Sequence, residues 1–392
     1  MTKVPFFDLK KQFVPLREEI LNEIASVCDA QAFILGAKVE KFEQAIAELC
    51  GGKHAIGVSS GTDAELLILM ALGIGPGDAV VTTPFSFFST AGCIARLGAT
   101  PVFVDIDPGT FSLSPEQLEL FFATQCTFDG GNLWTRDGLR VKAVVPVHLF
   151  GLCCAMDEIQ AICARYQLPV IEDAAQAIGT DYPSSEGIKQ AGAIGDFGYF
   201  SFYPTKNLGA FGDAGMAIAK DDLMGHRMKV LRNHGMEPKY YHEAVGGNFR
   251  LDALQAAILL KKLPYLAEWS QRRWAIAQFY RKEFANISPE IRLPEEPYAE
   301  VLGDRGHTYH QFVVRTTRRD ELREHLSGSG IGTEIYYPVP LSRQKCFSRF
   351  ATSWCPESEA AVQEVLALPI FPELNDGEVE MVASAVIAFF KK

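Results

Sequence analysis

Short apolar runs alternate with amphipathic stretches along the first 262 residues of the chain. The runs are continuous and rich in β-branched residues, which is typical of strands that are covered on both faces. The expected strands are 54–58, 79–82, 101–104, 141–146, 168–171, 198–202 and 214–219. Apolar residues recur with helical spacing between them, most clearly over 65–72 and 156–162. This alternation predicts an α/β domain with helices layered on a sheet.

The pattern changes after about residue 250. A long helical region covers 251–281, and Pro264 is expected to bend or break it. A Pro-rich bend, a short strand, a helix and a terminal helix follow, the first three at 293–297, 308–315 and 319–327. We therefore predict an N-terminal arm, a large α/β domain and a smaller α+β domain, over 1–20, 21–262 and 263–392. The Gly-containing segment 124–140 is expected to be an exposed insertion, to which the sequence assigns no role.

Composition narrows the class of protein. The chain has 392 residues, of which 48% are apolar and 22% charged, which excludes a disordered or collagen-like protein. Its net charge of −11 comes without a basic stripe, which argues against nucleic-acid binding. The longest apolar runs, such as 382–390, reach about half of the ~20 residues that a membrane span needs. Because the first residues also lack the apolar core of a signal peptide, we expect a cytoplasmic protein without a membrane partner.

Cysteine and histidine spacing points away from disulfides and metals. The nine cysteines include no Cys-x-x-Cys pair, and the eight histidines include no His-Glu-x-x-His pair. We therefore expect reduced, mostly buried cysteines and no metal site.

Three segments that follow or end expected strands carry the candidate chemistry. The first is 59–65, where a strand gives way to a helix whose free N–H groups and dipole favour an anion such as phosphate. Thr62 and Glu65 are expected to form a capping box at this helix start. Taken alone, the segment favours a plain strand-to-helix turn over an anion site.

The second segment, 168–176, places two acids and an amide at the carboxyl end of a strand, the edge where open α/β sheets bind ligands. Because side chains alternate along a strand, only one of Glu172 and Asp173 can point into a given site. A helix start with acids favoured by its dipole is the alternative explanation.

The third segment, 198–209, is an aromatic strand that ends at Ser201 and leads to Lys206. A lone lysine in a loop is usually a solvated surface charge. A lysine held in partly desolvated surroundings, however, becomes a nucleophile or proton carrier. A phosphate-binding turn, an acid at a strand end and such a lysine are together what a pyridoxal phosphate (PLP) site requires.

The chain resembles the DegT/DnrJ/EryC1/StrS family of PLP-dependent nucleotide-sugar aminotransferases over essentially its whole length. The matching motifs lie at 60–64, 84–90, 104–107, 146–151, 171–176, 201–206, 232–235 and 248–257. The resemblance implies the PLP-dependent transferase type I fold, which is that of aspartate aminotransferase, with a large mixed-sheet domain and a smaller C-terminal α+β domain.

The resemblance also implies roles for individual residues at the cofactor. Lys206 would form the Schiff base with PLP and shuttle the proton, and Asp173 would pair with the pyridine nitrogen. Gln176 would hydrogen-bond the phenolic oxygen of the cofactor. Phe87 would stack on its ring, although an ordinary core position is an alternative for this residue.

Further implied roles concern phosphate and substrate. The residues expected to hold the cofactor phosphate are Gly61, Thr62 and Ser201, with Asn248 reaching the phosphate in the neighbouring subunit. Arg250 would lie near that subunit's substrate, although a salt bridge at a helix start is an alternative for this residue. Tyr337 would help to define substrate choice. The implied assembly is a homodimer with shared active sites.

The implied reaction moves an amino group from L-glutamate to a keto group of a UDP- or TDP-linked sugar. The run 250–252 resembles members that aminate C3 rather than C4. A related dehydratase using the same cofactor is disfavoured by Lys206, because such members usually carry His there. A regulatory protein is disfavoured by the acidic charge. A nucleotide-dependent dehydrogenase is disfavoured because the glycines of 73–77 follow an expected helix rather than a strand.

Overall fold

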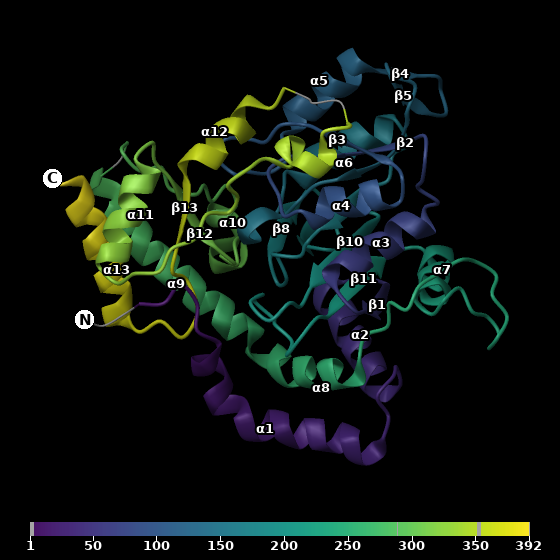
Figure 1. The fold of residues 1–392 in the computed structure, drawn as a ribbon, viewed down its shortest axis with the longest axis horizontal. Coiled ribbons are helices and arrows are strands. Elements are labelled where there is room, and N and C mark those ends of the chain that lie inside the picture. The colour runs from purple at the N-terminus through teal and green to yellow at the C-terminus, as the bar shows by residue number, and fades with distance from the viewer. Residues whose placement is uncertain (1–3, 288, 351–353, 392) are drawn as a thin grey trace.

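Two hydrogen-bonded sheets form the centre of the larger part of the protein. The computed structural model describes residues 4–287, 289–350 and 354–391 (Figure 1). The four-stranded sheet has the order β1 (His54–Val58), β11 (Gly215–Ala219), β10 (Phe197–Ser201) and β7 (Ile171–Asp173). The five-stranded sheet has the order β3 (Thr100–Phe103), β2 (Asp78–Thr82), β6 (Arg140–Val145), β5 (Leu133–Thr135) and β4 (Cys126–Phe128). Parallel bridges Val144–Val170 and Val147–Asp173 join β6 to β7, so that the two sheets continue into each other.

Strand direction determines where a site can form. β3, β2, β6, β7 and β10 pair in parallel, whereas β11 runs antiparallel to both β10 and β1. β1 is consequently parallel to β10, and the carboxyl ends of all these strands except β11 lie at one edge. Ligands of open α/β sheets bind at this edge.

Helices cover both faces of the sheet, as the continuous apolar runs predict. Consecutive residues of β2 belong to different core clusters: Val81 to the cluster of Phe42 and Ile159, and Val80 to the cluster of Leu67 and Ile94. The first cluster includes residues of α2 (Ala37–Cys50), α5 (Pro115–Gln125), α6 (Met156–Arg165) and α8 (Ala253–Lys262). The second includes residues of α3 (Gly61–Ala71), α4 (Ser89–Arg96) and α7 (Asp222–Arg232).

The strand predicted at 168–171 is displaced toward its carboxyl end. Its regular ladder begins only at Ile171, and Val170 makes a single bridge. Pro169 explains the difference, because proline has no N–H group to donate to a neighbouring strand. The displacement leaves Glu172 and Asp173 within the strand itself, on opposite faces.

The residues after 262 build a second cluster of helices and a short sheet. α9 (Leu266–Phe284) follows α8 after a 3₁₀ turn at Leu263–Tyr265, so the predicted break at Pro264 is confirmed. The two-stranded sheet pairs β12 (Phe312–Arg315) with β13 (Val365–Leu368). The accompanying helices are α10 (Ala299–Leu302), α11 (Arg319–Gly328), α12 (Pro356–Glu364) and α13 (Asp376–Phe390). Figure 1 shows this part on the side of the molecule that holds both chain ends.

α1 (Leu9–Ala30) runs along the outside of α8 (Figure 1), where Leu16 and Ile20 pack against Ile258. The predicted arm boundary at residue 20 falls inside this helix. Val4 bridges to Ile331 and joins the core of the second part. The division into an arm and two domains stays a prediction.

Two short hairpins occupy segments that the strand patterns did not reveal. The insertion 124–140 contains β4 and β5, and β5 pairs with the start of β6, so the insertion extends the sheet at its edge. A second hairpin pairs β8 (Asp181–Ser184) with β9 (Gly187–Gln190). Within the described residues, no helix combines the length and the apolar character that a membrane crossing requires.

Candidate active site

A cavity of about 760 Å³ opens at the carboxyl edge of the strands, between the sheet and residues of the second part. This volume lies in the range of small-molecule sites in proteins. Of the predicted site residues, the structure brings eight to its wall: Gly61, Thr62, Phe87, Asp173, Gln176, Ser201, Lys206 and Tyr337.

The turn between β1 and α3 forms one end of the cavity. The Oγ atom of Ser60 accepts a hydrogen bond from the N–H of Asp63 at 3.0 Å and caps the helix. The expected capping box of Thr62 and Glu65 is therefore wrong. Glu65 is fully buried on the inner face of α3, and this burial takes its carboxyl away from the helix start.

Close packing brings Ser201 against the start of α3. A Cβ atom on Gly61 would lie 2.8 Å from the Cβ atom of Ser201, so this approach depends on residue 61 having no side chain. The arrangement places the hydroxyl-bearing residues Thr62 and Ser201 beside a helix N-terminus at the cavity wall. A helix N-terminus with neighbouring hydroxyl groups suits a phosphate.

Asp173 is held in a fixed orientation at the cavity floor. Its Oδ2 atom accepts a hydrogen bond from Thr90 Oγ1 at 2.8 Å, and Oδ1 accepts one from the N–H of Ala175 at 3.1 Å. Because the Thr90 hydroxyl donates to Asp173, its 3.1 Å contact with Ser86 must be donated by Ser86. Sequence reasoning did not single out Thr90. Its position beyond the end of β2, at the same sheet edge as Asp173, was the available signal.

Lys206 lies in the loop after β10, and its backbone N–H donates to the carbonyl of Tyr203 at 2.8 Å. The sequence left open whether this lysine is a solvated surface charge. It instead lines the cavity, and desolvation lowers its pKa to about 8 against the opposing attraction of the Asp173 carboxylate. The uncharged fraction of the amine near neutral pH is therefore far larger than that of an exposed lysine, whose pKa is about 10.4, and this suits a nucleophile.

The pKa of Lys206 yields a first expected result. Without cofactor, acylation of the Lys206 amine by a water-soluble anhydride should rise with pH and level off above about 8, because only the uncharged amine reacts. The acylation rate of exposed lysines should keep rising with pH until about pH 10.4, their ordinary pKa. Peptide mass spectrometry after brief labelling across a pH series measures both. If the acylation rate of Lys206 were half-maximal only at about pH 10, this result would contradict the desolvated environment.

Gln176 and Tyr337 are joined across the two parts of the protein. Gln176 Nε2 donates to the Tyr337 hydroxyl at 3.1 Å, and Gln176 Oε1 accepts from the N–H of Phe150 at 2.7 Å. The ring of Phe87 lies 6.4 Å from that of Tyr337, and Phe87 is 57% exposed. The alternative that Phe87 is an ordinary core residue is therefore wrong.

A second link between the two parts lies beside the lysine. His310, which lines the cavity, shares a 3.0 Å hydrogen bond between its Nδ1 and Oδ1 of Asn207. Asn207 Nδ2 donates to the carbonyl of Thr308 at 3.2 Å. The residue that follows Lys206 is thus fixed to the second part of the chain. Sequence reasoning missed both residues.

Asn248 and Arg250 lie outside the cavity of their own chain. Asn248 is exposed and bridges to Asn233, and Arg250 Nη1 donates to Asn233 Oδ1 at 2.7 Å. They follow the long loop after α7, which projects from the body in Figure 1. Their predicted role in a neighbouring subunit stays a prediction.

The residues of the cavity fit PLP. The group needs an amine to attach its aldehyde, an acid for its ring nitrogen and a cradle for its phosphate, and Lys206, Asp173 and the start of α3 supply these three. When bound, PLP supplies a ring that stabilises negative charge on a substrate carbon.

Comparisons with known proteins agree with this chemistry. The profile of the DegT/DnrJ/EryC1/StrS aminotransferase family matches residues 15–387. The chain is 42% identical over 391 residues to a pleiotropic regulatory protein of Geobacillus stearothermophilus, covering 99% of both chains. It is 39% identical over 385 residues to a UDP-N-acetyl-3-dehydro-alpha-D-glucosamine 3-aminotransferase of Acidithiobacillus ferrooxidans, covering 98% of this chain and 97% of the other.

Among solved structures, the chain is similar to S. venezuelae DesV in complex with a ketimine intermediate. The TM-score is 0.90 and the sequence identity 37%, with both chains covered completely. The sheet order, the lysine cavity and these matches lead to one assignment. The chain belongs to the DegT/DnrJ/EryC1/StrS aminotransferase family, whose members are PLP-dependent enzymes with the type I, aspartate aminotransferase-like fold.

Proposed function

We propose that the protein transfers an amino group from L-glutamate to the C3 keto group of a UDP- or TDP-linked sugar. The observation that carries this proposal is the desolvated Lys206 amine in the same cavity as the fixed carboxylate of Asp173. The relative from Acidithiobacillus ferrooxidans, which is named a UDP-sugar 3-aminotransferase, supports the substrate class and the C3 position.

Each cavity residue has a distinct part in this proposal. Lys206 would hold the cofactor through its amine and would move a proton as general acid and base in both halves of the transfer. Asp173, oriented by Thr90, holds the proton of the ring nitrogen. Gly61 and the Thr62 and Ser201 hydroxyl groups hold the phosphate.

The remaining residues shape the cavity in the proposed reaction. Gln176, held by Phe150 and Tyr337, presents its amide to the phenolic oxygen, and Phe87 covers the ring. Tyr337 lines the side of the cavity formed by the second part of the chain and is held there by Gln176.

A two-stage assay tests the reaction. Protein saturated with PLP should be yellow, and L-glutamate should bleach the colour while 2-oxoglutarate appears in equal amount. The amine-loaded protein should then convert a UDP- or TDP-linked 3-keto sugar faster than its 4-keto isomer, as measured by mass spectrometry and NMR.

A colourless protein with added PLP would contradict the cofactor site. A preference for the 4-keto isomer would contradict the C3 assignment. Loss of water from the sugar without amination would favour the dehydratase, and a yellow protein inert to every sugar would favour a regulatory role.

The proposed homodimer, with Asn248 serving the neighbouring site, predicts complementation between two inactive variants. In a mixed dimer of Lys206→Ala and Asn248→Ala chains, one site pairs an intact Lys206 with an intact Asn248. Random exchange of equal amounts should therefore restore about a quarter of the wild-type activity, because half the dimers are mixed and half their sites are intact. Activity after mild dissociation and mixing measures this recovery. Activity that stays at the mean of the two unmixed variants would show that the sites are not shared.

A further inference from the structure

We propose that the buried His148–Glu172 pair positions the carboxylate of Asp173. This inference rests on the proposed function, in which Asp173 faces the ring nitrogen of PLP. Glu172 and Asp173 are adjacent acids in β7, and their side chains lie on opposite faces of the sheet. A shift of the strand by one residue would exchange the two acids between the faces. Some feature must therefore select Asp173 for the cavity.

The face behind the cavity binds the Glu172 carboxylate. Glu172 Oε1 accepts hydrogen bonds from the N–H groups of Ile194 at 2.6 Å and Gly195 at 2.7 Å. Its Oε2 atom accepts from the N–H of Gly192 at 2.8 Å and contacts His148 Nε2 at 2.8 Å. Glu172 is 0% exposed, so an acid is stable there only because these donors replace water. The shorter carboxylate arm of an aspartate would not reach the same set of donors.

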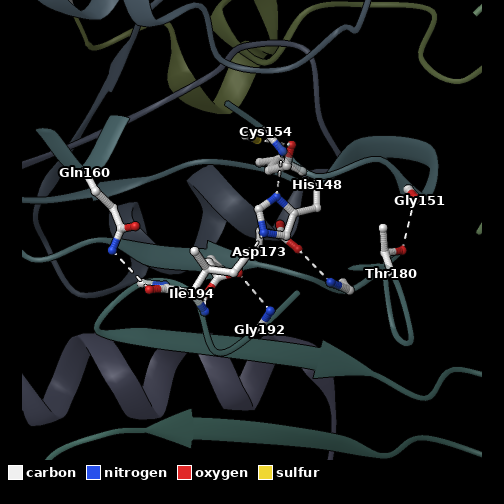
Figure 2. A network of polar contacts seen from close by, with 12 residues as sticks. His148, Gly151, Cys154, Gln160, Asp173, Thr180, Gly192 and Ile194 are labelled. Carbon is white, nitrogen blue, oxygen red and sulfur yellow. Dashed lines mark hydrogen bonds and ion pairs between the residues drawn. The ribbon is translucent and has the colours of Figure 1, made fainter. Parts of the chain in front are cut away.

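The tautomer of His148 follows from its other contact. The N–H of Cys154 donates to His148 Nδ1 at 3.1 Å, so Nδ1 carries no proton and Nε2 must be the nitrogen that donates to Glu172. Figure 2 shows the His148 ring between Cys154 and the strand that bears Asp173. His148 is also 0% exposed, which holds the ring in this orientation.

His148 also contacts Asp173 directly through the main chain. Its backbone N–H donates to the carbonyl of Asp173 at 2.9 Å, while the N–H of Asp173 donates to the carbonyl of Pro146 at 2.9 Å. One residue thus binds the side chain of Glu172 and the backbone of Asp173 together. The pair fixes the register of a strand that has only three residues, and Thr90 then orients the carboxylate that faces the cavity.

The test follows the protonation of the PLP ring nitrogen by ¹⁵N NMR with ring-labelled cofactor. Glu172→Gln places an amide NH₂ against backbone donors, and His148→Leu removes the Nε2 donor. Both should move the ¹⁵N signal toward the unprotonated form and lower kcat about tenfold or more, with KM for glutamate within about twofold. His148→Gln, whose amide can donate to Glu172, should have a kcat within about threefold of the wild-type value. Glu364→Gln is the matched control, because it weakens the ion pair between Glu364 and Arg315, neither of which lines the cavity.

The outcomes separate this inference from the proposed function. A wild-type ring nitrogen that is unprotonated, or a signal unchanged by Asp173→Asn, would overturn the proposed site. A wild-type signal that Asp173→Asn moves but Glu172→Gln and His148→Leu leave in place would overturn only the positioning role. The same conclusion would follow if these variants lowered the melting temperature no differently from Glu364→Gln and left kcat unchanged. If Glu172→Gln yields no folded protein, the contrast between His148→Leu and His148→Gln decides.

Discussion

Replacing Lys206 by alanine is expected to lower amino transfer by at least about 10³-fold, the largest effect of any single change in the cavity. In the proposed reaction, this change removes both the amine that would attach the cofactor and the proton carrier, and general acid–base catalysis alone contributes about 10²–10⁴-fold. Single-turnover rates with L-glutamate measure the loss. The absorbance band of the Schiff base between Lys206 and PLP should also be absent, because the variant cannot bind PLP covalently.

A control isolates the chemistry of this amine from the loss of a positive charge. Lys261→Ala removes a lysine of α8 whose ion pair with Glu23 spans 3.3 Å, outside the cavity. It should keep the colour and the rate of the wild type. Lys206→Arg retains the charge but not the nucleophile, and it should fail as alanine does. Substantial turnover by either Lys206 variant would rule out the proposed role.

Much of the sheet could be predicted because its signal is local. The continuous apolar runs of β1, β2, β10 and β11 need no knowledge of their neighbours, and the structure confirms them within about a residue. The hairpins β4–β5 and β8–β9 have strands of three or four residues, which are too short to carry a period. The start of β7 depends on a missing N–H group at Pro169, which the apolar pattern does not reveal.

The site residues likewise fall into those that the sequence reveals and those that only the tertiary structure reveals. Asp173 is detectable because it ends a strand with an acid, and Lys206 because it follows an aromatic strand in a loop at the same edge of the sheet. The Asn207–His310 bond and the Gln176–Tyr337 bond join residues more than 100 positions apart, so only the tertiary structure reveals them. The helix cap at Ser60, in place of Thr62, depends on burial of Glu65 against the core, which is also a tertiary effect.

The second large effect is expected from Asp173→Asn, which should reduce kcat about 10²–10³-fold. The amide retains the shape and a hydrogen-bonding oxygen for Thr90, but it has no negative charge to keep the ring nitrogen protonated. Removing one preorganised electrostatic contact from an active site typically costs this much. Single-turnover kinetics with L-glutamate measure the rate. Because the lysine remains, the variant should still be coloured with PLP.

Two further variants test this explanation. Thr90→Val leaves the Asp173 charge but removes the 2.8 Å bond that orients it, so it should lose about tenfold, the equivalent of one charge-assisted hydrogen bond. Asp129→Asn changes an acid of the β4–β5 loop, which lies outside the cavity, and should leave the rate unchanged. The order of effects, with Asp173→Asn far larger than Thr90→Val and Asp129→Asn neutral, is the signature of a charge that acts on the ring nitrogen. If Asp173→Asn and Thr90→Val lowered kcat equally, the orientation of this carboxylate, and not its charge, would be what matters for the reaction.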